Sequence, residues 1–156
     1  MLMSHVTPSF YPLQSAYMTL YSTEMALLKI INYICKAVDI RRTTTLVALN
    51  LSAAFDSIDH FILLSRLERS FGVIGQVLSW VRSYLTEWTS FVMVGNASSP
   101  ITFCNTGVPQ GSDLSPLLFS LFIKILGEVI SAFSVKFHQY ADDTRIYLTI
   151  DKENSL

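Results

Sequence analysis

Two strand-like segments near the C-terminal end of this 156-residue chain are separated by only four residues. They are residues 135–140 and 145–150, and the residues between them are Ala-Asp-Asp-Thr. Such a short connection favours an antiparallel hairpin. The chain is therefore expected to contain an antiparallel sheet in which two adjacent carboxylates, Asp142 and Asp143, lie at the tip of a hairpin.

Helical and strand-like patterns alternate along the rest of the chain, after an extended lead-in of about 20 residues that contains two prolines. The first expected elements are a helix from a cap at Ser22 or Thr23 to about Asp39 and a buried strand over Thr43–Asn50. Two helices are expected next, one capped by Ser57 and ended by Gly72, the other with apolar residues from Val77 to Trp88. A hairpin of residues 91–94 and 101–104 that turns at Gly95 and Asn96, and a helix from about Ser115 to Ile130, are expected after them. This order predicts one α+β domain with helices packed on an antiparallel sheet.

Composition narrows the possible classes of protein. The chain is 51% hydrophobic and 15% charged with a net charge of -1, which excludes a disordered protein and lacks the basic excess of a self-sufficient nucleic-acid binder. The longest charge-free apolar run, Leu114–Ile123, ends at Lys124 and is shorter than the roughly 20 residues of a membrane span, so no membrane partner is expected. Cys35 and Cys104 are expected to be two buried thiols in a reducing compartment.

The paired aspartates have two interpretations on their own. Asp is a preferred turn residue, so a solvated turn explains them without any function. Adjacent carboxylates also repel each other, and a shared cation relieves that repulsion; their hard oxygen ligands favour magnesium.

Three motifs stand in order along the chain: residues 49–60 (Leu-Asn-Leu-Ser-Ala-Ala-Phe-Asp-Ser-Ile-Asp-His), 107–112 (Gly-Val-Pro-Gln-Gly-Ser) and 140–144 (Tyr-Ala-Asp-Asp-Thr). Together they resemble the motifs of reverse transcriptases of the LINE type, the non-LTR retrotransposons. Residues 14–17, 22–24 and 83–85 are similar to the same group, so the resemblance covers nearly the whole chain.

The resemblance implies the polymerase palm, a ferredoxin-like antiparallel sheet with packed helices. Residues 43–156 would carry the palm motifs, and residues 1–42 would be a lead-in and helix that precede the palm. Most of the fingers and thumb, which clamp the duplex in such enzymes, are expected to be missing. The implied reaction is RNA-directed DNA synthesis on an RNA template, with a DNA primer, a dNTP and two Mg²⁺ ions.

By the same resemblance, Asp142 and Asp143 are the metal-binding catalytic carboxylates. The third belongs at position 50, where the family has aspartate and this chain has Asn50. An amide offers one neutral oxygen where a bridging ligand needs two anionic ones, so catalysis is expected to be impaired. Asp56 is no obvious substitute, because it is part of the family pattern and a place near the start of a helix, favoured by the helix dipole, explains it without catalysis.

Four further residues match positions that contact nucleotide or template in the family: Phe55, Gln110, Gly111 and Tyr140. Core packing, turn formation and strand propensity explain the same residues without a ligand. The chain also departs from the family at Met18 and Trp88, where arginine is usual, and at Ser115, where glycine is usual.

Three functions therefore remain open: a reverse transcriptase domain fragment that is catalytically impaired, a non-catalytic relic of the palm that binds nucleic acid or protein, and a membrane-associated protein suggested by composition alone. Magnesium-dependent primer extension separates the first from the second, and solubility without detergent separates the third from both.

Overall fold

The computed structural model describes residues 12–18, 20–86 and 88–150, which form two compact units. The sheet unit contains the described residues up to Ser52 together with residues from Ile123 onward, and the helical unit contains those of residues 53–122. Helices and antiparallel strands occur together, which confirms the expected α+β class.

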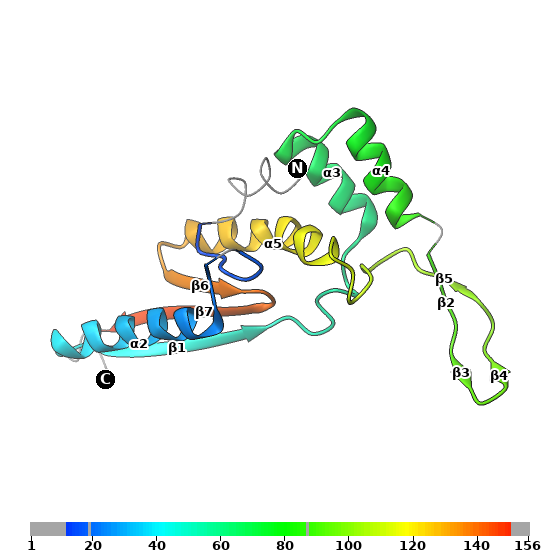
Figure 1. The fold of residues 1–156 in the computed structure, drawn as a ribbon. Coiled ribbons are helices and arrows are strands. Elements are labelled where there is room, and N and C mark those ends of the chain that lie inside the picture. Colours follow the sequence, from blue (N-terminus) through cyan, green and yellow to red (C-terminus); the bar gives the residue numbers. More distant parts are fainter. Residues whose placement is uncertain (1–11, 19, 87, 151–156) are drawn as a thin grey trace. The chain divides into compact units, whose positions relative to one another are not determined.

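A three-stranded antiparallel sheet is the centre of the sheet unit (Figure 1). Its order is β1 (Thr43–Asn50), β7 (Asp143–Ile150) and β6 (Lys136–Tyr140), so β7 is central. The predicted strand at residues 43–50 and the predicted hairpin of β6 and β7 are both confirmed. The predicted four-residue tip is wrong, because Asp143 and Thr144 already belong to β7 and only Ala141 and Asp142 make the turn.

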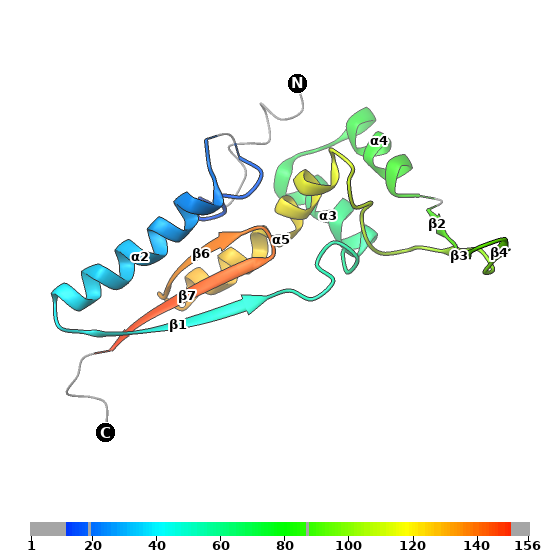
Figure 2. The same ribbon diagram turned by 60° about the horizontal axis from the view of Figure 1, so that its bottom comes forward.

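Helix α2 (Thr23–Asp39) lies along this sheet, as Figure 2 shows. The expected cap is confirmed at its first turn, where Ser22 Oγ accepts a hydrogen bond from the amide of Met25. Tyr33 holds the helix to β7, because its ring lies 4.7 Å from the Tyr147 ring and its hydroxyl is 2.7 Å from the hydroxyl of Thr149. Side chains alternate between the two faces of a strand, so the face of β7 that contacts α2 carries Asp143 together with Tyr147 and Thr149.

In the helical unit, α3 (His60–Phe71) and α4 (Gly75–Leu85) contribute buried leucine and valine side chains. Gly72 ends α3 in the left-handed conformation, as predicted. Ser57 was the wrong cap: Asp59 Oδ1 accepts from the amide of Ile62 at 2.8 Å, while the Ser57 hydroxyl donates to the carbonyl of Ala54. Trp88 lies beyond the end of α4, contrary to the prediction.

A narrow ribbon follows α4 and projects from its unit (Figure 1). Its ladders are β2 (Thr89–Ser90) with β5 (Thr102–Phe103), and β3 (Met93–Val94) with β4 (Ala97–Ser98), so the turn at Gly95 and Asn96 is confirmed. The predicted continuous strands are wrong. Pro100 has no amide to donate, and the Ser99 hydroxyl accepts from the amide of Val92, so the ladder is interrupted there.

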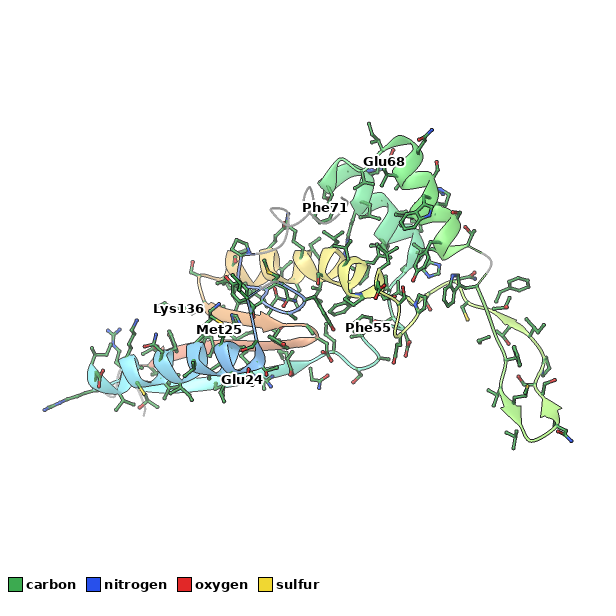
Figure 3. All side chains as sticks on the ribbon, in the orientation of Figure 1. Glu24, Met25, Phe55, Glu68, Phe71 and Lys136 are labelled. Atoms are coloured by element: carbon green, nitrogen blue, oxygen red, sulfur yellow. The ribbon has the colours of Figure 1, made fainter. Side chains whose placement is uncertain are left out.

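The ribbon leaves large apolar side chains exposed both before and after its turn (Figure 3). They are Phe91, Val92, Met93, Val94, Ile101 and Phe103. Contiguous exposed apolar surface promotes association. The isolated chain is therefore expected to be marginally soluble.

Size-exclusion chromatography at several concentrations measures this, and we expect the apparent mass to rise with concentration. A double variant, Phe91→Ser with Phe103→Ser, should shift the profile toward the monomer, whereas the exposed control Ser90→Thr should not. A wild-type chain that elutes as a monomer at every concentration and binds no hydrophobic dye would contradict the expectation.

Helix α5 (Ser115–Ala132) extends beyond the predicted apolar run and through Lys124, whose ammonium lies 3.8 Å from the Glu128 carboxylate. Over the described residues it is the one helix that is long and apolar enough to cross a membrane, and half of its residues are buried inside the protein. A core helix meets the same criteria of length and composition.

Both cysteines are free, but Cys35 is exposed, so the predicted burial of that thiol is wrong.

Candidate functional site

Asp142 and Asp143 lie where the ends of three strands meet in the sheet unit. Asp142 occupies the turn, and Asp143 is the first residue of the central strand β7. Asn50, the last residue of β1, pairs directly with Asp143 on one side, and Tyr140, the last residue of β6, pairs with it on the other. Side chains directly opposite each other in an antiparallel pair have Cβ atoms about 5 Å apart on the same face of the sheet. The fold thus brings Asn50, from a distant segment of the chain, into one row with Tyr140 and Asp143 of the hairpin.

Arg145 changes the charge of this row. Its guanidinium Nη1 lies 3.0 Å from Asp143 Oδ1, and both side chains are partly exposed. The two residues are separated by one position in β7, so their side chains lie on the same face of the sheet. This spacing is visible in the sequence and would have predicted the pair. Asp143 therefore already has a cation beside it, whereas no Lys or Arg within the described ranges forms an ion pair with Asp142.

Tyr17 and His138, two residues of the sheet unit, have shifted pKa values. Burial, followed by the charges of Asp142 and Tyr140, raises the pKa of Tyr17. Burial and the nearby Lys29 ammonium lower the pKa of His138 to about 4, and its Nε2 lies 2.9 Å from the Ser15 hydroxyl. At neutral pH both rings are therefore uncharged, and neither balances the charge of the aspartates.

Gln14 contacts the hairpin turn from the lead-in segment. Its side chain forms hydrogen bonds with both the amide and the carbonyl of Ala141, and its own residue forms a parallel bridge with Gln139 on β6. Because 127 positions separate Gln14 from Ala141, no local pattern in the sequence indicates this contact.

The other predicted site residues belong to the helical unit, where a turn and a loop are held together. The amide of Gly107 donates to the carbonyl of Ile58 at 2.8 Å, and the amide of Val108 donates to the carbonyl of Phe55 at 2.9 Å. Gln110 reaches the same turn, with its Nε2 3.5 Å from Asp56 Oδ1. These contacts fix the loop of residues 107–111 against the turn that follows β1 in the sequence.

Phe55 has a packing role in this unit. Its ring stacks on the ring of Phe119 with centroids 4.7 Å apart, near the beginning of α5 (Figure 3). It remains partly exposed, so part of the ring is available to a ligand. Packing and ligand contact are therefore compatible for this side chain.

A pocket of about 500 Å³ opens beside these residues in the helical unit. Its lining includes Asp56, Gly107 and Gln110 together with Trp88, Ser90 and Cys104. Gly111 does not line the pocket; its φ is positive, at 87°, and a β carbon at this position would meet no atom within 4 Å. Asp56 is exposed and lines the pocket. It precedes the Asp59 cap of α3, so it does not occupy the position at the start of that helix that was predicted from the sequence.

The donor set of the sheet unit fits a divalent cation only in part. Across the described segments, no group of three or more histidine, cysteine, aspartate and glutamate side chains could hold a metal ion. Two hard carboxylate ligands are present, one is paired with Arg145, and the residue opposite it is a neutral amide. This set fits one weakly held ion and does not fit two ions bridged by shared carboxylates.

Comparison with known proteins gives a consistent result. Residues 1–155 match the family described as reverse transcriptase (RNA-dependent DNA polymerase). The RNA-directed DNA polymerase from the mobile element jockey of Drosophila melanogaster is 30% identical over 146 residues, which cover 90% of this chain and 16% of that protein.

Two further relatives are similar over shorter stretches. The retrovirus-related Pol polyprotein from the type-1 retrotransposable element R2 of Popillia japonica is 30% identical over 90 residues, or 58% of this chain and 14% of its own length. The probable RNA-directed DNA polymerase from transposon BS of Drosophila melanogaster is 31% identical over 102 residues, or 65% of this chain and 11% of its own length. The chain thus spans about one sixth or less of the relatives that it matches.

Proposed function

Because this chain belongs to the reverse transcriptase (RNA-dependent DNA polymerase) family, we propose that residues 43–156 form the palm of such a polymerase and that residues 1–42 precede it. The observation that supports this most is the row of Asn50, Asp143 and Tyr140 across the sheet, with Asp142 in the adjoining turn. Its relatives are RNA-directed DNA polymerases of non-LTR retrotransposons, and residues 1–155 match the reverse transcriptase domain.

The proposed substrates are an RNA template, a DNA primer and a dNTP. In the reaction, the primer 3′ hydroxyl loses its proton to solvent as its oxygen forms a bond to the α-phosphorus of the dNTP, the bond from that phosphorus to the bridging oxygen breaks, and pyrophosphate leaves. Phe55 would contact the sugar of the incoming nucleotide with its exposed part. Gln110 and Gly111 would contact nucleotide or template from their loop, and Tyr140 would lie beside the primer end.

A divalent cation, when bound, would neutralise charge on the triphosphate, and Asp142 and Asp143 are the residues that would hold it. The Arg145 guanidinium competes with the cation for Asp143, and Asn50 adds no charge. We propose that these two features make the domain catalytically impaired. They also favour the second candidate function, a non-catalytic relic of the palm that binds nucleic acid or protein.

Metal binding by the turn is expected to be weak, with a dissociation constant on the order of 1 mM, because most coordination positions remain with water. Isothermal titration of the chain with Mn²⁺ measures it. Arg145→Met removes the competing cation and should tighten binding by up to about fivefold, the upper range for a partly exposed ion pair. Asp142→Asn should abolish the signal. Tight binding of two ions by the wild-type chain would contradict the proposal.

Primer extension tests the function itself. The chain is placed between the intact fingers and thumb of a related polymerase, and Asn50 is changed to aspartate. Magnesium-dependent incorporation on an RNA template by this restored chimera supports the palm assignment. A folded chimera that binds the template and primer but adds no nucleotide favours the non-catalytic relic.

A further inference from the structure

Gln14 makes the most complete set of hydrogen bonds to the turn that carries the aspartates. Its side chain is 2% exposed, its Nε2 donates to the carbonyl of Ala141 at 3.2 Å, and its Oε1 accepts from the amide of Ala141 at 3.1 Å. The same Oε1 accepts from the amide of Ala16 at 3.1 Å. Both polar ends of the buried amide are therefore satisfied, two of its three bonds going to a single residue of the turn.

The backbone on either side of Gln14 is held against β6. The amide of Ser15 donates to the carbonyl of Gln139 at 3.1 Å, and the amide of Gln139 donates to the carbonyl of Leu13 at 3.0 Å. The backbone at Gln14 is thus fixed relative to β6, and the side chain extends from this fixed position to the turn. A contact anchored in this way restrains the turn more strongly than one made by a mobile loop.

Ala141 needs such restraint for a conformational reason. Its φ is 52°, in the left-handed region, which costs a residue with a β carbon about 1 kcal/mol. As a turn residue it also lies outside the ladders of β6 and β7. The two bonds from Gln14 satisfy the amide on one side of Ala141 and the carbonyl on the other, so they fix both peptide planes that flank it.

The carbonyl of Ala141 belongs to the peptide plane that leads into Asp142, and Asp143 follows directly. We propose that Gln14 is a positioning residue, a clamp on Ala141 that sets the direction in which the Asp142 and Asp143 carboxylates project. This role rests on the proposed palm function, because it assigns the clamp to those carboxylates. Gln14 itself touches neither the reacting atoms nor the aspartate side chains.

Hydrogen exchange measured by mass spectrometry on the 156-residue chain tests the clamp without any activity. In Gln14→Met, which keeps the size of the side chain and loses its polar atoms, the peptide that covers residues 139–144 should exchange about tenfold faster at the Ala141 amide. The matched control is Ser15→Ala, which removes a neighbouring buried hydroxyl that contacts His138 and not the turn. Its exchange at Ala141 should stay within about twofold of wild type.

Exchange at the Ala141 amide that is equally fast in Gln14→Met and wild type would overturn the clamp. Equal acceleration in Gln14→Met and Ser15→Ala would overturn it too. If Gln14→Met fails to fold, as judged by exchange in β1 and β7, Gln14→Glu takes its place. The glutamate keeps the acceptor oxygen for the Ala141 amide and loses the bond donated to the carbonyl, so intermediate protection is expected. Protection at the wild-type level would again overturn the clamp.

A second readout separates positioning from mere support of the fold. In the chimera that carries Asn50→Asp, Gln14→Met should lower kcat by about tenfold with little change in the KM for dNTP, because misdirected ligands act on the chemical step. Ser15→Ala should leave both constants unchanged. Lost protection at Ala141 with an unchanged kcat would overturn the positioning role. If the restored chimera adds no nucleotide at all, the palm function fails while the exchange result still decides the clamp.

Discussion

Changing Asn50 to aspartate in the chimera with intact fingers and thumb is expected to raise primer extension by at least about 100- to 1000-fold. Phosphoryl transfer depends mainly on charge stabilisation and positioning, and loss of one preorganised electrostatic contact costs this much in other enzymes. A bridging carboxylate is expected to contribute more. Asn50 lies directly opposite Asp143 in the ladder of β1 and β7, so the new carboxylate is placed beside an existing one.

The measurement compares the unmodified chimera with its Asn50→Asp variant on an RNA template with magnesium, after circular dichroism has shown equal folding. A matched control is Asn96→Asp, which adds the same charge at an exposed position in the turn of the ribbon. It should leave extension at the background level. Robust and equal activity of the unmodified chimera and its Asn50→Asp variant would show that Asn50 is not disabling, and Asp56 would then be the next carboxylate to change.

Gly107→Ala is expected to destabilise the helical unit far more than Gly111→Ala does. The two glycines have nearly the same φ, 89° and 87°, so both substitutions carry about 1–2 kcal/mol of backbone strain. A β carbon at position 107 would also lie 3.1 Å from the α carbon and 3.2 Å from the carbonyl oxygen of Asp56. At position 111 it would meet no atom within 4 Å. We therefore expect an additional cost of about 1–3 kcal/mol for Gly107→Ala.

The free energy of unfolding from urea titration measures both variants, and the difference between them isolates the crowding from the strain. The neighbour at Gly107 is backbone, which cannot swing aside as the end of a flexible side chain can. Equal destabilisation by the two substitutions would mean that the turn of residues 53–58 moves away at little cost. The contact between that turn and the loop would then be loose.

Local patterns predicted the elements whose partners are close in sequence. The run of β-branched and apolar residues over Thr43–Asn50 is typical of a strand and gave both ends of β1 correctly. The cap of α3 was wrong because Ser57 and Asp59 are both good capping residues two positions apart. The bonds from Gly107 and Val108 to Ile58 and Phe55 hold the earlier residues in a turn, and a distant loop therefore decides where α3 begins.

The features of the candidate site also divide into those that local patterns predict and those that depend on distant contacts. Asp142, Asp143 and Asn50 could be proposed from motifs because those motifs are contiguous, whereas the clamp by Gln14 depends on a contact across 127 positions. The pair of Asp143 and Arg145 needed only the two-residue period of a strand, but the tip was predicted to be two residues longer than it is. That error placed Asp143 outside the strand and concealed the shared face.

The alternation of side chains along β7 makes the chemistry at Asp143 sensitive to insertions and deletions within that strand. Side chains alternate along a strand, so one residue inserted between Thr144 and Arg145 would leave Asp143 opposite Asn50 and turn the guanidinium to the other face of the sheet. The ion pair would be lost although no residue of it had been replaced. In chains of this kind, an alignment gap of one position in the central strand therefore changes the charge of the site as much as a substitution does.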